Sequence, residues 1–321
     1  MKEFLISKND SGQRLNKFLE KAVPALPGGM MHKYLRLKRI KLNGKRTESA
    51  ARLCEGDRLQ LYINDEFFRA PSEDTAFHRI SPDISVVYED HNLLLADKKP
   101  GMVVHADNSG EINTLINHIK AYLYQKGEWD PQEEPSFTPA LCNRIDRNTG
   151  GIVIAAKTAA ALRILNDKIK RHEVVKRYLC IVHGRPVPPN GTIDKPLWKD
   201  SKQNQVFPVS SLSKGAKRAV THYRTLEAGQ RFSLLECTLE TGRTHQIRAH
   251  MASIGHPLLG DGKYGGVFNR GLESKYQFLY SYQITFAFRT PAEDLSYLNG
   301  QTFTVKTVKF AQDFHTLDQK N

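Results

Sequence analysis

The feature of this sequence that most restricts its possible folds is a change of pattern between residues 65 and 82. Before it, apolar residues recur at helical spacing and then alternate as in short strands, whereas after it strand and helix patterns are mixed along the rest of the chain. The segment 65–82 combines acidic, aromatic and proline residues without either period. We therefore predict two domains, at residues 1–64 and 83–321, joined by a linker at 65–82.

The first domain is predicted to contain two short helices and a small sheet. Apolar residues between Leu15 and Val23 lie at helical spacing, and a Pro-Gly-Gly break separates this helix from a second one that begins near Met30. Alternating apolar residues follow on both sides of an Asn43-Gly44 dipeptide, which is typical of a tight hairpin turn. This domain should therefore be a compact α+β unit.

The second domain is predicted to be a larger α+β unit. Strand patterns occur at residues 84–88, 93–96, 152–156, 176–182, 219–226 and 232–240. Helix patterns occur at 112–123 and from Thr158, a good N-cap residue, to about residue 170. A proline- and glutamate-rich stretch at 125–139 reads as a surface loop. Residues 83–321 therefore mix strands and helices from their beginning.

Charge and hydropathy limit the partners and the location of the protein. Lysine and arginine number 47 against 34 aspartates and glutamates, a formal net charge of +13, which favours a polyanionic partner. No apolar run approaches the roughly 18 residues that a membrane span needs, and the N-terminus has no secretory signal pattern. We therefore expect a cytoplasmic protein without membrane association.

Three patterns that suggest cofactor or metal chemistry are outweighed by other readings. The four cysteines form no CxxC pair and are expected to be reduced, mostly buried thiols. His245 and His250 lie five residues apart, whereas two metal ligands on one helix face lie four apart. The segment 260–265 matches GxGxxG but follows a helix rather than a strand, so it should be a structural loop. We predict no cofactor and no metal.

Positive charge is concentrated in the first domain. Residues 1–64 contain 14 lysines or arginines against 6 aspartates or glutamates. Such a stretch is either a solvated charged face or a surface that binds phosphate groups, and clustering around one helix and turn favours RNA binding. The predicted RNA-binding residues are Lys17, Lys33, Arg36, Lys38, Arg39 and Lys45. The segment also resembles the alpha-L motif, a small RNA-binding module shared with a ribosomal protein.

The polar segment from Asn143 to Gly151 carries the strongest candidate for chemistry. Asp146 lies between Arg144 and Arg147, just before a buried strand. An aspartate beside arginines stays ionised, so it can be a structural ion-pair partner or a nucleophile or base in a pocket. The residue types and their spacing leave these two readings level.

Several ordered motifs resemble the RluA family of pseudouridine synthases. The segment 143–151 is similar to the family's catalytic loop, and the resemblance extends over about residues 84–290. The other matching stretches are 87–90, 97–105, 176–178, 182–184, 241–250 and 256–261. The resemblance implies an α+β pseudouridine synthase fold with a mixed, largely antiparallel sheet. Two positions depart from the family pattern: Asn143 replaces a common His, and Gly150 replaces a common Ser and should loosen the turn.

The resemblance also implies a role for each matching residue. Asp146 is the expected essential carboxylate, and Arg243 is expected to pair with it and keep it charged. Tyr178 matches an active-site tyrosine that stacks on uracil and assists proton transfer. Arg144 matches the residue that fills the space left by an extruded uridine.

The predicted activity is isomerisation of a specific uridine to pseudouridine in structured RNA. Large-subunit ribosomal RNA is the first choice of substrate, because the appended basic module is typical of the ribosomal-RNA enzymes in the resembled family. Transfer RNA is the alternative substrate. A noncatalytic RNA-binding ribosome-assembly factor is the alternative function. We expect the protein to act as a monomer.

Overall fold

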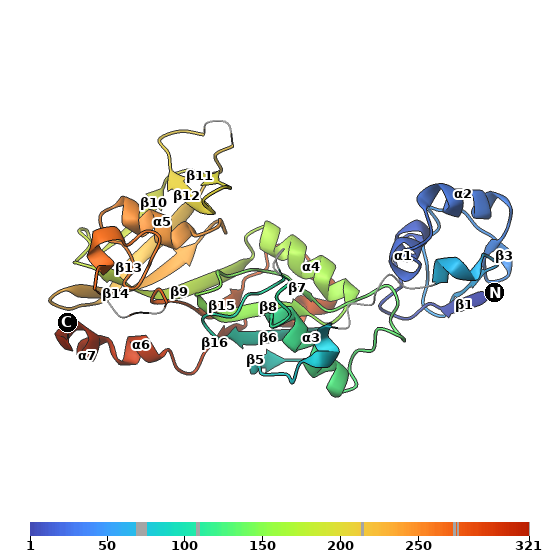
Figure 1. Ribbon diagram of the computed structural model, residues 1–321, viewed down its shortest axis with the longest axis horizontal. Helices are drawn as coiled ribbons and strands as arrows, with labels where there is room; N and C mark the ends of the chain where they lie inside the picture. The colour runs from blue at the N-terminus through green and yellow to red at the C-terminus, as the bar shows by residue number, and fades with distance from the viewer. Residues whose placement is uncertain (69–75, 107–109, 213–214, 272–273, 275, 321) are drawn as a thin grey trace.

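The chain forms two units that are distinct in Figure 1. The computed structural model describes residues 1–320 apart from 69–75, 107–109, 213–214, 272–273 and 275. A smaller unit is built from the N-terminal residues, and a larger unit contains a long twisted sheet with helices on both sides.

The N-terminal unit packs two helices against a four-stranded sheet. The helices are α1 (Leu15–Ala22) and α2 (Gly28–Arg36), and the strands β1 (Lys2–Leu5), β2 (Ile40–Leu42), β3 (Lys45–Arg46) and β4 (Arg58–Leu61) lie in the order β1-β4-β2-β3. Both helices occur where apolar spacing predicts them, and β1 adds an edge strand that the sequence pattern does not reveal. Asn43 and Gly44 both have positive φ, 52° and 75°, as a type I′ hairpin requires.

The segment between the two units packs partly against the larger one. It contains two short 3-10 helices, η1 (Asp65–Phe68) and η2 (Ala76–Arg79), while residues 69–75 of the predicted linker lie outside the described residues. Phe77 of η2 is buried in the hydrophobic core of the larger unit. The second half of the predicted linker therefore contributes to that core.

Within the described residues, ten strands of the larger unit form one mixed sheet. The main path runs β10-β13-β14-β9-β15-β8-β6-β5, with β16 paired to β15 and β7 paired to β8. All these pairs are antiparallel except β8 with β15. The strands are β5 (Ser85–Glu89), β6 (Leu93–Lys98), β7 (Ala140–Leu141), β8 (Gly150–Ala156), β9 (Val174–His183), β10 (Asn190–Asp194), β13 (Val220–Ala228), β14 (Phe232–Leu239), β15 (Leu279–Phe286) and β16 (Thr302–Thr304).

A hydrophobic core lies on each face of this sheet. Alternate residues of β6 and β8 point to opposite faces, so Leu94 and Val153 join one core and Leu95 and Ile154 the other. Helices α3 (Leu115–Gln125) and α5 (Gln246–Ser253) contribute to the first core, and α4 (Ala159–Lys170) covers the second. Burial on both faces explains why these strands read as continuous apolar runs.

The remaining elements extend from the ends of the sheet. A hairpin of β11 (Leu197–Asp200) and β12 (Gln205–Pro208) projects beside α5 in Figure 1. The other elements are η3 (Gly266–Asn269), η4 (Glu293–Leu298), α6 (Lys309–Gln312) and α7 (Phe314–Lys320). The carboxylate of Asp318 on α7 accepts hydrogen bonds from three successive backbone N–H groups at 230–232, which fastens the C-terminal helix to the turn before β14.

The two units also contact each other through polar groups. Asp10, which is fully buried, accepts a hydrogen bond from the hydroxyl of Ser136, and Gln13 donates to the same hydroxyl at 2.7 Å. Asn9 donates to Glu134 at 2.7 Å. The predicted surface loop at 125–139 therefore provides the side chains that hold the N-terminal unit.

The four cysteines are unpaired by disulfides. Cys180 and Cys237 are buried on neighbouring strands with their sulfur atoms 3.8 Å apart, Cys142 is half-buried and Cys54 is exposed. No helix in the described part of the chain is both long enough and apolar enough to cross a membrane.

Candidate active site

Asp146 lies in the loop that connects β7 to β8, near the middle of the large sheet. The backbone of this loop is fixed by the next residue, because the carbonyl oxygen of Arg147 accepts hydrogen bonds from the Gly101 N–H at 2.9 Å and from the Lys98 ammonium at 2.9 Å. Lys98 also donates to the carbonyls of Lys99 and Met102, at 3.0 and 2.7 Å. The catalytic-loop candidate is therefore tied to the segment 98–102 on β6 and the turn after it.

The Lys98 side chain that binds this loop is almost fully buried, which is unusual for a lysine. Burial lowers the pKa of its amine to about 7, although the negative charge of Asp146 acts in the opposite direction. Three carbonyl acceptors match the three N–H bonds of an ammonium group, so this geometry accommodates the charged form.

A large cavity opens beside Asp146. Its volume is about 1110 Å³, and its lining includes Arg144, Asp146, Arg243, His245 and Arg248. The Asp146 side chain retains 24% of its exposure, so its carboxylate can be reached from the cavity. Most charged groups on this wall are cationic, which suits a polyanionic ligand. The cavity combines a reachable carboxylate with space for a nucleobase.

The carboxylate of Asp146 is held by Arg248. Arg248 lies in the first turn of α5, and its Nη1 donates to Asp146 Oδ2 at 3.0 Å. The same guanidinium makes two hydrogen bonds to the buried Asp261, from Nε at 2.7 Å and from Nη2 at 2.9 Å. Asp261 thus fixes the plane of the guanidinium, and the guanidinium in turn orients Asp146.

Arg248 and Asp261 stabilise each other's charged forms. Burial acts to lower the pKa of Arg248, but the hydrogen bonds and charges of Asp261 and Asp146 outweigh it and raise that pKa. Burial acts to raise the pKa of Asp261, but Arg248 and the backbone N–H groups of Lys263 and Tyr264 keep it lowered. Arg248 and Asp261 are therefore both ionised near neutral pH.

In the described part of the chain, Arg248 rather than the expected Arg243 is hydrogen-bonded to Asp146. Arg243 is exposed at the cavity rim, and its Nε donates to the carbonyl of Arg218 at 3.0 Å. Its backbone N–H donates to the side chain of Gln246, which caps the turn before α5. Because Arg243 precedes the helix whereas Arg248 lies within it, only Arg248 projects from α5 to the carboxylate.

Tyr178 lies on β9, next to Asp146. Both residues line a small cavity of about 60 Å³ that also contacts Arg144 and Arg243. Burial raises the pKa of Tyr178 to about 12, with a further contribution from the charge of Asp146 and an opposing one from its hydrogen bond with Ser281. The phenol is therefore neutral at physiological pH. All four predicted site residues, Arg144, Asp146, Tyr178 and Arg243, meet around one cavity system.

The two histidines singled out in the sequence have separate places. His245 lies in the cavity wall, with Nδ1 3.0 Å from the hydroxyl of Tyr264 and Nε2 3.9 Å from Asp146 Oδ2. Its pKa is lowered mainly by burial, so it is neutral near pH 7. The nitrogens of His250 contact Thr221 and the Lys195 carbonyl, away from the cavity. Among the described residues, no group of three potential metal ligands is found.

The segment 260–265 is a structural loop, as predicted, and it positions Asp261. It holds Asp261, which receives backbone hydrogen bonds from Lys263 and Tyr264 and binds Arg248. The hydroxyl of Tyr264 also lies 3.0 Å from His245 Nδ1, in the cavity wall. The loop therefore positions the arginine that binds Asp146.

The structure also explains one of the two departures from the family pattern. A Cβ atom at Gly150 would approach Cε2 of Tyr280 to 2.3 Å, so a serine would collide with that ring. The expectation that Gly150 merely loosens the turn is wrong: it is buried in β8 and leaves room for Tyr280, whose hydroxyl binds Asp97 at 2.6 Å. Asn143 accepts a hydrogen bond from the Ile154 N–H at 2.8 Å.

The predicted RNA-binding residues lie far from this cavity in the chain fold, on the N-terminal unit (Figure 1). All six side chains are exposed, and Lys17 forms an ion pair with Glu20 at 2.7 Å. Arg39 stacks against the ring of Tyr34 at 5.9 Å. Within the described residues, Lys33, Arg36, Lys38 and Lys45 form no ion pair.

Three residues around Asp146 were not assigned roles from the sequence: Lys98, Arg248 and Asp261. Each lies inside a stretch that resembles the RluA family, so the signal was present as a motif. What the motif does not reveal is which of its charged residues faces the carboxylate, because that depends on where α5 begins.

Comparisons with known proteins identify the family of the chain. The family model described as RNA pseudouridylate synthase matches residues 92–253. The chain is 32% identical over 260 residues to the uncharacterised RNA pseudouridine synthase YlyB of Bacillus subtilis, which covers 81% of each chain. It is 31% identical to ribosomal large subunit pseudouridine synthase D of Escherichia coli over 261 residues, 81% of this chain and 75% of the relative.

A second enzyme of that name, from Zymomonas mobilis, is 42% identical over 182 residues, which cover 57% of this chain and 56% of the relative. Among solved structures, human RNA pseudouridylate synthase domain containing 4 has a similar fold. Its TM-score is 0.55 at 22% identity, over 76% of this chain and 93% of that one. The mixed, largely antiparallel α+β fold and the enzyme class predicted from the motifs are therefore confirmed, and the chain belongs to the RNA pseudouridylate synthase family.

Proposed function

We propose that this enzyme converts a specific uridine of large-subunit ribosomal RNA to pseudouridine, with Asp146 as the catalytic carboxylate. The single observation that carries the proposal is the carboxylate of Asp146, reachable from a cavity of about 1110 Å³ and fixed by an arginine that is itself fixed by Asp261. The ribosomal substrate is supported by the relatives named ribosomal large subunit pseudouridine synthase D.

The reaction breaks the N1–C1′ bond of the uridine, turns the uracil and joins its C5 to C1′. The proton lost from C5 is balanced by the one gained at N1, so no oxidant, reductant or group donor is consumed. Asp146 can begin the reaction by attack on C1′, by attack on C6 or by removal of a proton from C2′. Each route requires an ionised carboxylate, and the hydrogen bond from Arg248 at 3.0 Å orients the carboxylate of Asp146.

The neighbouring side chains have complementary roles in this proposal. Tyr178 lines the small cavity beside Asp146, and in this proposal its ring stacks on the detached uracil while its neutral hydroxyl takes part in proton transfer at C5. Arg144 is exposed at the cavity mouth and can occupy the space that the extruded uridine leaves in the RNA. Arg243 at the rim can bind a phosphate of the substrate.

The N-terminal unit is proposed to bind RNA away from the site of chemistry. Support comes from the resemblance to the alpha-L motif and from the exposed cations Lys33, Arg36, Lys38, Arg39 and Lys45. These residues would add affinity without selecting the base. Action as a monomer in the cytoplasm, where ribosomal RNA is found, is part of the same proposal.

The proposal can be tested by mapping pseudouridines in total RNA from cells with the wild-type protein, without it, and with an Asp146→Asn variant. We expect one or a few large-subunit positions to lose pseudouridine in both altered strains. Loss confined to transfer RNA would replace the proposed substrate. An unchanged map together with defective ribosome assembly would instead indicate a noncatalytic assembly factor.

A further inference from the structure

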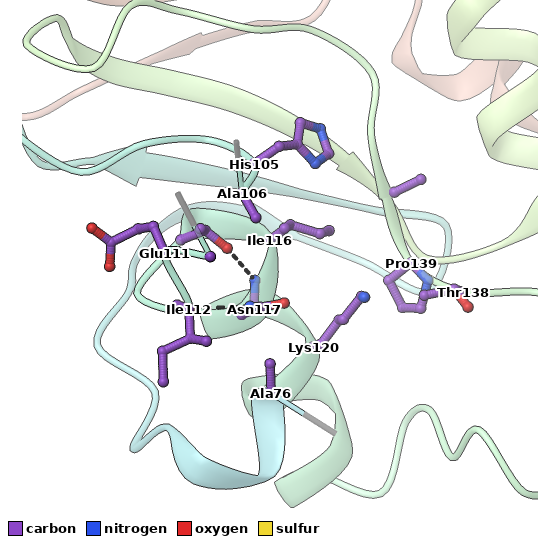
Figure 2. Close-up of a pocket in the computed structure, with 13 residues that line it drawn as sticks. Ala76, His105, Ala106, Glu111, Ile112, Ile116, Asn117, Lys120, Thr138 and Pro139 are labelled. Atoms are coloured by element: carbon purple, nitrogen blue, oxygen red, sulfur yellow. Dashed lines mark hydrogen bonds between the residues drawn. The ribbon is translucent and has the colours of Figure 1, made fainter. Parts of the chain in front are cut away.

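A second cavity adjoins the one that contains Asp146. Its volume is about 460 Å³, and it lies between the first turns of α3, the segment 138–140 and Ala76 (Figure 2). The two cavities share His105 and Ala106 in their walls. The two cavities therefore lie on either side of these two residues.

The lining of this second cavity combines apolar surfaces with a few polar groups. Ile112, Ile116 and Pro139 supply apolar walls, and Asn117 is fixed by a hydrogen bond from its Nδ2 to the Ile112 carbonyl at 3.0 Å. Figure 2 shows Lys120 extending from α3 toward Pro139 and Thr138. The volume falls within the roughly 300–1,000 Å³ of typical ligand pockets, with the usual mixture of apolar walls and a few polar groups.

Positive charge lies on both sides of the shared wall. Arg144 lines the larger cavity and Lys120 the smaller one. The pKa of His105 is lowered by partial burial and then by the charges of Arg144 and Lys120, which indicates that the imidazole lies within range of both cations. A phosphate close to Arg144 or Lys120 would meet favourable potential there, and Glu111 is the carboxylate that also lines the smaller cavity.

An RNA substrate has such a chain on each side of the target uridine. Once that uridine occupies the cavity of Asp146, its covalently joined neighbours must lie at the mouths of that cavity. We propose that the second cavity binds the base of a nucleotide adjoining the target uridine, with the base packed on Ile112, Ile116 and Pro139 and Lys120 donating to one of its acceptor atoms. This inference rests on the proposed function and names a subsite for sequence context.

The subsite should affect binding and selectivity rather than the chemical step. Within the residues that the structure describes, no hydrogen bond or ion pair joins its polar side chains to Asp146, so a base held there is expected to lower KM for the correct RNA and leave kcat unchanged. Base stacking on apolar side chains tolerates several bases, whereas a single cation favours those that present a carbonyl oxygen near it.

The test uses an RNA stem-loop that carries the uridine found by the mapping, in three forms: intact, abasic on its 5′ side and abasic on its 3′ side. For the wild-type enzyme we expect KM to rise about tenfold for one of the abasic RNAs, with kcat changed less than twofold. Equal KM values for all three RNAs would overturn the proposal.

Two variants assign that effect to the cavity. Lys120→Gln removes the cation, and Thr138→Tyr narrows the opening from an exposed position that leaves the core intact. Both should bind the intact RNA more weakly and lose most of the abasic penalty. If Lys120→Gln is destabilised in thermal unfolding, Thr138→Tyr decides alone, and a full abasic penalty in that variant would overturn the proposal.

Lys126→Gln is the matched control. Lys126 lies at the end of the same helix but pairs with Glu89 and Glu128, outside the second cavity. This variant should retain the wild-type abasic penalty, and its loss would also count against the proposed subsite. If the wild-type enzyme does not convert the intact RNA, the proposed function is refuted. If it converts the intact RNA and both abasic RNAs with equal KM, only the proposed subsite is refuted.

Discussion

The active-site cavity and the N-terminal unit both display positive charge, but they hold it in opposite ways. The side chain of Arg248 is only 7% exposed, and its guanidinium makes three hydrogen bonds to two carboxylates. Lys33, Arg36 and Lys38 on α2 and the residues after it are exposed and, within the described residues, form no ion pair. In the active-site cavity, Arg248 fixes the positions of two carboxylates. On the N-terminal unit, the cations remain exposed to solvent.

Buried and exposed cations differ in how strongly they interact with their surroundings. A buried arginine that loses a carboxylate partner leaves an uncompensated charge, which typically costs about 3–5 kcal/mol, so the network around Asp146 has a strong preference for one arrangement. Exposed lysines and arginines interact weakly and at long range, and salt screens them. The comparison predicts that changes in the hydrogen-bonded network around Asp146 alter kcat, whereas changes of exposed cations alter KM and, on the N-terminal unit, its dependence on salt.

The largest effect is expected for Asp146→Asn. The amide cannot act as a nucleophile or base, so turnover of the mapped RNA should fall by roughly 10⁴-fold or more, as it does when other essential carboxylates or nucleophiles are removed. RNA binding, measured by filter retention, should stay within a few-fold of wild type. Asp167→Asn, on the exposed face of α4 and paired with Arg171, is the matched control and should have wild-type turnover.

The next largest effect distinguishes the two arginines of the segment 241–250. Lysine at position 248 cannot bind Asp146 and Asp261 together, so Arg248→Lys should lower kcat by about 10²–10³-fold. Arg243→Lys, at the exposed rim, should change kcat less than about tenfold and act mainly on KM. Single-turnover kinetics of both variants would measure this. The reverse order of effects would favour the pairing inferred from the motif.

These arginines illustrate how much of the site could be predicted from the sequence. The ordered motifs bring Arg144, Asp146, Tyr178 and Arg243 to one cavity system, as expected from their resemblance to the family. The ion-pair partner of Asp146 could not be chosen, because both arginines belong to one motif. The choice depends on the start of α5 at Gln246, after a His245 residue with positive φ. That local backbone turn is not visible in a residue pattern.

The fold, like the site, could be predicted only in part from the sequence. Local signals predicted most helices and strands, including the Thr158 N-cap, whose hydroxyl accepts from the Ala161 N–H at 3.1 Å. The parallel contact of β8 with β15 joins residues 150 and 280, far apart in the sequence, and no local pattern specifies it. That pairing also places Tyr280 against Gly150. This contact explains why glycine replaces the serine that is common at this position in the family, which the sequence alone did not explain.

A smaller effect on turnover is expected for Tyr178→Phe. Loss of the hydroxyl should lower kcat by about 10²-fold if the phenol assists proton transfer, while the ring remains available for stacking. Because the pKa of Tyr178 is raised to about 12, its ionisation should leave no limb in the kcat–pH profile between pH 7 and 10. A limb in that range that disappears in Tyr178→Phe would contradict the neutral phenol.

The same raised pKa predicts a change of stability at high pH. In the unfolded chain tyrosine ionises near pH 10, whereas in the fold Tyr178 stays protonated to about 12. Its contribution to stability is therefore complete below about pH 10 and is lost as the pH rises toward 12. Denaturant unfolding of the wild type and of Tyr178→Phe at several pH values should show their difference in stability shift in that window.

The smallest effect on turnover, and the clearest effect of salt, is expected on the N-terminal unit. Replacement of Lys33, Arg36 and Lys38 by glutamine should raise KM about 10- to 100-fold at low salt and leave kcat unchanged. If these three residues contact phosphates, the slope of log K against log salt concentration should decrease by about 2–3. Arg39 is kept, because it also packs on Tyr34.

The control for that variant removes the same charge from the other region. Arg163, Arg171 and Lys309 are exposed on the larger unit, and each forms an ion pair with a carboxylate. Their replacement by glutamine lowers the net charge equally, so a mere effect of total charge would give both variants the same salt slope. Equal slopes would refute a dedicated RNA-binding role for the N-terminal unit. A reduced slope for the α2 variant alone would show that exposed, unpaired cations at that place make the phosphate contacts.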